Sequence, residues 1–188
     1  MDIIDSVGFN GPIIITIITV YQLFKQIPYL ISFCVFNFIN IKLNEFLKIC
    51  FREPRPEKID LAQEQKKSIV YKLFYGNNNQ TKVHSIVDPS HIYGMPSGHA
   101  QTGAFALGFL YFVQKSSPLF LLAAFIFLIT LYQRWNTKKH TIFQLFIGTL
   151  TGILFSSFAY YGTKTYLYSS PFGKINMNDF IFKFKYLD

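Results

Sequence analysis

The sequence predicts an all-α integral membrane protein, a compact helical bundle of about five transmembrane helices. Of its 188 residues, 51% are hydrophobic, 19% are aromatic and only 15% are charged. Soluble domains carry roughly 25% charged residues, so this composition favours a chain that faces lipid. The apolar residues also cluster in blocks whose length suits membrane-crossing helices, which need about 20 residues each.

Five apolar blocks account for the predicted helices, and they cover residues 11–24, 28–48, 97–113, 118–135 and 140–161. The first block is short for a membrane span unless its helix begins near Val7. Two polar segments remain, a loop over 49–95 and a basic, aromatic tail over 162–188. Because no internal repeat or low-complexity linker divides the chain, we expect one membrane-embedded domain over 1–188 with its core over 28–160.

The net charge is +8 at pH 7, and most basic residues lie between or after the apolar blocks. This excess favours anionic membrane lipids and phosphates as partners, and no nucleic-acid partner is expected. Cytoplasmic loops are rich in lysine and arginine, which sets the predicted orientation. With five crossings, one side collects Lys25, Lys115 and the tail lysines at 164, 174, 183 and 185. That side is then cytoplasmic, and the 49–95 loop is extracytoplasmic, that is, lumenal or extracellular.

Cations and histidines gather at the extracytoplasmic ends of the predicted helices. In chain order, the residues near these ends are Lys48, Arg55, Ser97, Gly98, His99, Arg134 and His140. Each has an ordinary explanation when taken alone, because a cation at a helix end often reaches back to the interface, and a single histidine there is more often structural. Together they predict an anion site with acid–base or nucleophilic capacity.

The segment Pro96-Ser97-Gly98-His99 has the features of an anion-binding helix start. Serine is a good N-cap, glycine lets a ligand approach the backbone, and the helix dipole attracts negative charge. A histidine in this position exchanges a proton near neutral pH. For this segment alone, a capped helix with a surface histidine is the plain alternative.

Three ordered motifs resemble those of the type 2 phosphatidic acid phosphatase superfamily, which also includes the vanadium haloperoxidases. The first is K-x6-R-P, which begins at Lys48, and the second is P-S-G-H, which ends at His99. The family's third motif is S-R-x5-H-x3-D, and here Arg134 and His140 match it at the same spacing. The resemblance covers about residues 28–160. It implies a membrane lipid phosphatase, because the haloperoxidase relatives are soluble.

The resemblance implies metal-independent hydrolysis of a lipid phosphate monoester or diphosphate, with no cofactor. His140 is then the nucleophile that forms a phosphohistidine, and His99 is the acid that protonates the leaving oxygen. The groups that bind phosphate oxygens are then the side chains of Lys48, Arg55, Arg134 and Ser97 and the Gly98 N–H. Elementary chemistry agrees, since cations and a helix N-terminus neutralise charge spread over phosphoryl oxygens. The sequence shows no convincing metal-ligand cluster.

Two positions depart from the family pattern. Gln133 stands where the family has serine, and Gln144 stands where it has the aspartate that orients the nucleophile. His140 and Gln144 share one helix face, so the amide oxygen can accept the imidazole N–H. An amide cannot stabilise an imidazolium as a carboxylate does, and loss of the carboxylate in a serine-protease triad costs about 10⁴ in rate. A loop carboxylate such as Asp88 is a candidate substitute.

The substitution at Gln144 keeps a second function open, a catalytically weak or inactive family member that binds lipid phosphate or acts as a membrane scaffold. A small transporter or channel is a third hypothesis, which rests only on polar residues inside the predicted helices. The sequence does not distinguish phosphatidic acid from a polyprenyl diphosphate. It also sets neither the organelle nor the oligomeric state.

Two patterns predict how the helices pack. Polar side chains recur along one face of the second predicted helix, at Asn37, Asn40, Asn44 and Lys48. Hydrogen bonds to another helix are the favoured explanation for this stripe. On the fifth predicted helix, Gly148 and Gly152 lie four residues apart, which permits close contact with a neighbouring helix.

Overall fold

The computed structural model describes residues 2–56, 93–114 and 117–169. Within these ranges the chain forms five α-helices and no strand, which confirms the predicted all-α class. In chain order the helices are α1 (Ile3–Leu23), α2 (Ile27–Phe51), α6 (Gly98–Gln114), α7 (Pro118–Asn136) and α8 (Ile142–Ser169).

The helix boundaries differ from the predicted blocks near both ends of the chain. α1 begins at Ile3 and has 21 residues, because the residues before the apolar block also join the helix. Pro12 lies inside this helix. α8 begins at Ile142 and continues to Ser169, well past the predicted end. His140 therefore lies in the connection before α8, which corrects its predicted place in the helix.

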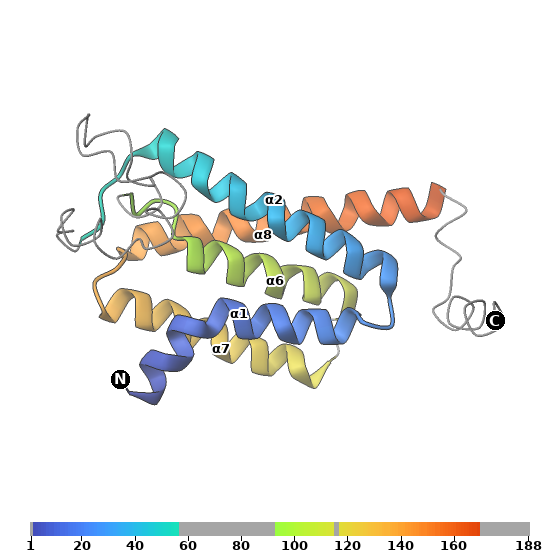
Figure 1. Ribbon diagram of the computed structural model, residues 1–188, viewed down its shortest axis with the longest axis horizontal. Helices are drawn as coiled ribbons and strands as arrows, with labels where there is room; N and C mark the ends of the chain where they lie inside the picture. The colour runs from blue at the N-terminus through green and yellow to red at the C-terminus, as the bar shows by residue number, and fades with distance from the viewer. Residues whose placement is uncertain (1, 57–92, 115–116, 170–188) are drawn as a thin grey trace, which may run out of the picture.

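The central helix is α6, which packs against α1, α2, α7 and α8 (Figure 1). It has 17 residues, so its length is about 26 Å against about 30 Å for a bilayer's hydrocarbon core. The core around it includes Phe33 of α2, whose ring lies 5.8 Å from that of Phe105 and 5.5 Å from that of Phe109. The other helices thus shield α6 from the surroundings.

Glycines bring α8 into close contact with α6, as predicted. A Cβ added at Gly148 would lie 2.6 Å from the Ser97 carbonyl oxygen, and one at Gly152 would lie 2.3 Å from that of Gln101. Both distances are too short for any side chain, so the backbones meet only because these positions lack one. The start of α6 is therefore placed directly by α8.

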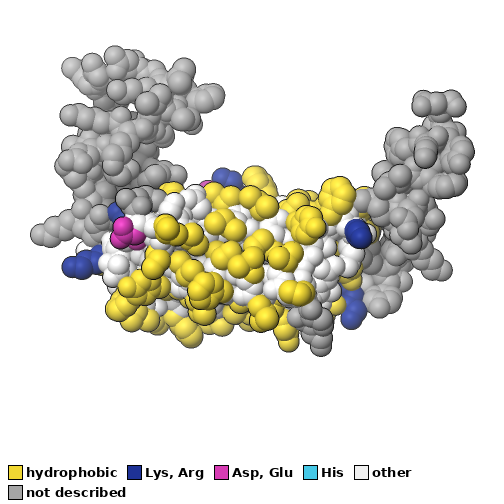
Figure 2. All heavy atoms as spheres, turned by 90° about the horizontal axis from the view of Figure 1, so that it is seen from below, with side chains coloured by type: hydrophobic (Ala, Val, Ile, Leu, Met, Phe, Trp, Pro, Cys, Tyr) yellow, Lys and Arg dark blue, Asp and Glu magenta, His cyan; other side chains and the backbone are white. Residues whose placement is uncertain are grey.

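The exterior is compatible with a membrane protein. By length and composition, four of the described helices, α1, α2, α7 and α8, can cross a membrane. Many large apolar side chains on these helices are exposed. Figure 2 shows hydrophobic side chains over the middle of one face, with most of the visible lysine and arginine side chains toward its two ends. Such a band matches the apolar zone of a bilayer between two polar interfaces.

Candidate functional site

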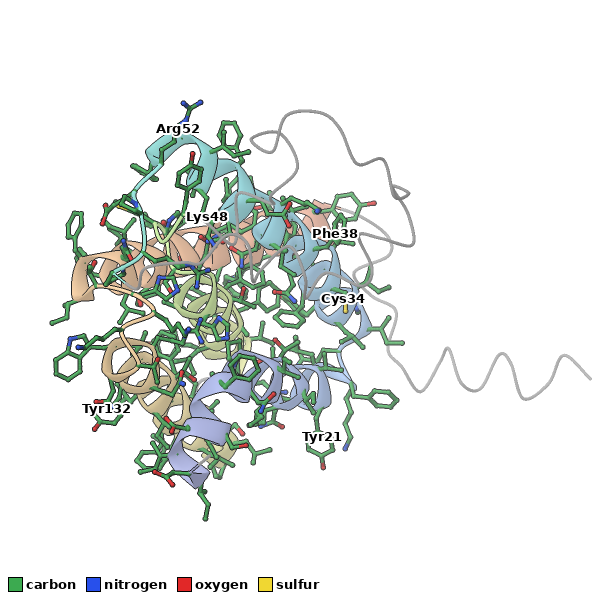
Figure 3. The ribbon with its side chains drawn as sticks, turned by 60° about the vertical axis from the view of Figure 1, so that its left-hand side comes forward. Tyr21, Cys34, Phe38, Lys48, Arg52 and Tyr132 are labelled. Atoms are coloured by element: carbon green, nitrogen blue, oxygen red, sulfur yellow. The ribbon has the colours of Figure 1, made fainter. Side chains whose placement is uncertain are left out.

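The end of α2 supplies the first predicted phosphate-binding residues. Lys48 lies in the last turn of α2, is only 4% exposed and points into the bundle, whereas Arg52 points outward (Figure 3). Arg52 ends the helix in the left-handed conformation, with φ 51°, and its N–H donates to the Lys48 carbonyl at 3.0 Å. A left-handed residue turns the chain away from the helix axis. Glu53, Pro54 and Arg55 follow this turn.

A short backbone pairing joins this segment to the loop before α6. Pro54 and Tyr93 form an isolated antiparallel bridge, and the N–H of Gly94 donates to the Glu53 carbonyl at 2.8 Å. A Cβ added at Gly94 would lie 2.5 Å from Oε1 of Gln144, so glycine leaves room for that side chain. The pairing places the K-x6-R-P and P-S-G-H motifs together, against the start of α8.

A buried amide network holds α2 against the start of α6. Nδ2 of Asn44 donates to the Pro96 carbonyl at 3.2 Å and to Oε1 of Gln101 at 2.8 Å. Nε2 of Gln101 donates in turn to Oδ1 of Asn40 at 2.9 Å. These bonds confirm the interhelical role predicted for Asn40 and Asn44. They also tie the P-S-G-H segment to the helix that carries Lys48.

Ser97 and Gly98 form the start of α6. Ser97 is fully buried, and its Oγ lies 3.5 Å from the N–H of Ala100, the position of an N-cap. Its own N–H donates to the Gln144 carbonyl at 3.2 Å. N–H groups in the first turn of a helix have no partner within the helix, which makes this turn suited to an anion.

His99, in the first turn of α6, is held by a helix that carries none of the motifs. Its ring hydrogen-bonds to the backbone of Phe9 in α1. The two rings also lie 5.8 Å apart. Because one ring nitrogen is occupied by the backbone of α1, the other is the one that can exchange a proton with a ligand.

The connection between α7 and α8 folds back on the end of α7. The N–H groups of Lys139 and His140 both donate to the Arg134 carbonyl, at 3.1 and 3.2 Å. Oγ1 of Thr137 donates to the Gln133 carbonyl at 2.7 Å. Arg134 and His140 are consequently close together, and both side chains are buried.

Hydrogen bonds decide the tautomer of His140. Its Nδ1 lies 3.0 Å from the Gly94 carbonyl oxygen and 3.3 Å from Oε1 of Gln144. The amide of Gln144 is oriented unambiguously, because Oε1 accepts from the N–H of Thr141 at 3.2 Å and Nε2 donates to the Pro54 carbonyl at 3.0 Å. Both neighbours of Nδ1 are therefore acceptors, so Nδ1 carries the proton and Nε2 keeps its lone pair.

The electrostatics of the site favour a neutral His140. Burial, followed by the positive charges of Arg55, Arg134 and Lys48, lowers the pKa of His140 from 6.5 to about 3. The hydrogen bond with Gln144 acts in the opposite direction. A neutral imidazole with a free Nε2 is an able nucleophile, and the same three cations attract an anion.

The structure brings the predicted site residues to the same end of the bundle, where α2 and α7 end and α6 and α8 begin (Figure 1). Sequence reasoning missed Glu53, the Gly94 carbonyl and Phe9. An acidic residue between two motif cations was the only available signal for Glu53.

Asp88 lies outside the described residues, as do most of the 49–95 loop and the end of the tail. Among the described residues, no three His, Cys, Asp or Glu side chains gather to hold a metal ion.

Comparison with known protein families identifies a family for this chain. A family model described as the PAP2 superfamily matches residues 27–167. This range contains all three motifs and leaves α1 outside. No curated protein matches the chain, and no solved structure does.

Proposed function

Because the chain belongs to the PAP2 superfamily, we propose that it is a metal-independent lipid phosphatase that acts through a phosphohistidine intermediate. Membership in the superfamily supports a phosphatase-type function in general. The apolar exterior supports a lipid phosphate or lipid diphosphate as substrate, since such a molecule shares the membrane with the protein. Membrane lipids are then its immediate partners.

One observation carries the proposal, the environment of His140. Its Nδ1–H is held by the Gly94 carbonyl at 3.0 Å, so that Nε2 is the reactive nitrogen. Its protonation is opposed by Arg55, Arg134 and Lys48. A plain interfacial histidine needs neither a fixed tautomer nor nearby cations, whereas both favour attack of a histidine on phosphorus.

The proposed reaction has two steps. Nε2 of His140 attacks phosphorus, the bond to the leaving oxygen breaks, and His99 gives that oxygen a proton. Water then attacks the phosphohistidine and loses a proton to His99, and the phosphorus–nitrogen bond breaks to release phosphate. Throughout, the charge on the phosphoryl oxygens is neutralised by Lys48, Arg55 and Arg134, with Ser97 and Gly98 at the helix start.

We place the reaction at the extracytoplasmic face of a multi-pass membrane protein. The connection between α1 and α2, which contains Lys25, lies at the opposite end of the bundle from the motifs (Figure 1). Lys164, near the end of α8, supports the same orientation by the positive-inside rule. Lys115 and the last tail lysines lie outside the described residues.

The alternative is a family member that binds lipid phosphate with little or no turnover. The observation that favours it is the amide of Gln144, which accepts the proton of His140 but carries no charge to balance an imidazolium. The two functions differ in a measurable quantity, the release of phosphate.

The test is phosphate release in detergent with a chelator present. The substrates are phosphatidic acid, lysophosphatidic acid, diacylglycerol diphosphate and a polyprenyl diphosphate. We expect release by the wild-type protein and its loss in His140→Ala, and the preferred lipid names the substrate class. Activity that appears only in Gln144→Asp would support the binding alternative. No release from any of these folded proteins contradicts the phosphatase proposal.

A further inference from the structure

We infer that Glu53 is a positioning residue for His140 and that it acts through the amide of Gln144. The inference rests on the proposed function of His140 as a nucleophile. Glu53 lies in the K-x6-R-P motif, and its Oε1 accepts a hydrogen bond from Nε2 of Gln144 at 2.8 Å. Position 144 has an amide where the family motif has a carboxylate. Glu53 thus supplies a carboxylate one side chain further from the imidazole.

The Gln144 amide links the carboxylate to the ring. Its Nε2 faces Glu53 at 2.8 Å, and its Oε1 faces Nδ1 of His140 at 3.3 Å. A hydrogen bond to a carboxylate is roughly twice as strong as a neutral one. It also polarises the amide, which makes the amide oxygen a better acceptor for the imidazole N–H. Positive charge that develops on His140 during attack is stabilised through this chain.

The backbone of Glu53 supports the same arrangement. Its carbonyl accepts from the N–H of Gly94 at 2.8 Å. The carbonyl of Gly94 is in turn the closer acceptor for Nδ1 of His140, at 3.0 Å. One residue therefore anchors both acceptors of the Nδ1 proton, one through its side chain and one through its backbone.

The kinetic test compares Glu53→Gln with the wild-type protein, and Glu45→Gln serves as the matched control. Glu45 is half-buried on the same helix as Lys48, and its carboxylate pairs with Lys42 at 2.9 Å. Glu53→Gln keeps a neutral hydrogen-bond acceptor but removes the charge. We expect kcat to fall about tenfold with KM within about twofold, because the charge acts on the reacting histidine. Glu45→Gln should match the wild type.

A double variant separates positioning from a structural role. In the Gln144→Asp background a carboxylate contacts His140 directly, and Glu53 becomes a like charge beside it. Adding Glu53→Gln to that background should leave kcat unchanged or raise it. A similar loss of kcat in both backgrounds would indicate a structural role and overturn the inference.

A second readout does not depend on turnover. Nitrogen NMR of isotope-labelled histidine rings reports the tautomer, and the His140→Asn variant identifies the His140 signals among those of the four histidines. We expect the Nδ1–H form in the wild type and a mixture of forms in Glu53→Gln. If the tautomer shifts while no protein releases phosphate, the inference stands and the phosphatase proposal fails. If neither the tautomer nor kcat changes in Glu53→Gln, the inference is wrong.

Discussion

Burial and neighbouring cations act on His140 in the same direction. Both disfavour the imidazolium, and together they hold the pKa of His140 at about 3. A phosphate that binds among Lys48, Arg55 and Arg134 would cancel much of their charge and raise this pKa. Burial and the three cations thus keep His140 neutral, and under the proposed function a bound phosphate makes the positive charge on His140 easier to form.

The lowered pKa of His140 predicts that acid destabilises the fold. Below pH 6.5 the unfolded chain binds a proton at His140 that the folded chain does not bind until about pH 3. The free energy of unfolding should therefore fall across this range, by at most about 1.4 kcal/mol per pH unit. The measurement is Tm in detergent at about pH 7.5 and about pH 5.

The control for this experiment is His140→Asn, which cannot take up the proton. We expect the wild type to lose more Tm on acidification than the variant does. Equal losses in the two proteins would mean that His140 has an ordinary pKa in the folded state.

Of the contacts between helices, the contact between α6 and α8 has the most direct influence on the site. Gly148 and Gly152 allow the two backbones to meet, and the N–H of Ser97 donates to the Gln144 carbonyl across this contact at 3.2 Å. The start of α6 and the first turns of α8 are therefore in direct contact. A change in their separation moves Ser97 relative to His140.

Gly148→Ala should lower both stability and phosphate release. Its Cβ would lie 2.6 Å from the Ser97 carbonyl oxygen, so the backbones must move apart. Overpacking of this kind costs about 1–3 kcal/mol. Tm and kcat measured on the same preparation report the two effects.

Gly162→Ala is the matched control on the same helix. A Cβ added there meets nothing within 4 Å, and alanine is the better helix former by about 1 kcal/mol. We expect unchanged kcat and an equal or higher Tm. If Gly148→Ala behaved like Gly162→Ala, the close contact would have no influence on the site.

At the scale of the whole molecule, the bundle brings three cations from separate segments of the chain to the site. Lys48 comes from α2, Arg134 from α7 and Arg55 from the loop after α2, and all three act on His140. Their mutual repulsion opposes folding, and a bound anion relieves it. Binding to the native state alone also stabilises it by mass action.

Inorganic phosphate should therefore raise Tm, and Lys48→Met should weaken this effect. Lys48 is buried at the site end, whereas Lys42, six residues earlier on α2, is exposed and pairs with Glu45. We expect Lys42→Met to keep the full phosphate-dependent rise. A thermal-shift titration with phosphate at constant ionic strength measures both variants. The same rise in both would argue against a phosphate site at Lys48.

Hydropathy and motif spacing determined the helical class and most of the candidate site. An apolar block of sufficient length enters a membrane as a helix whatever its neighbours are. Successive helices cross in opposite directions, so the end of one helix lies on the same side of the membrane as the start of the next. This is why Lys48, His99, Arg134 and His140 could be assigned to one end from the sequence. The start of α1 was less predictable, because polar residues join a helix according to what surrounds them.

Only the tertiary structure decided how the His140 ring is oriented. The sequence indicated that the amide oxygen of Gln144 could accept the imidazole N–H of His140, although it wrongly placed both residues in one helix. It did not indicate that Glu53 lies at the other end of the amide or that the Gly94 carbonyl accepts the Nδ1 proton. These contacts depend on the pairing of Pro54 with Tyr93, which joins segments far apart in the chain. Local sequence sets helices through short-range hydrogen bonds and burial, whereas such contacts exist only once long-range packing has fixed the separation of the helices.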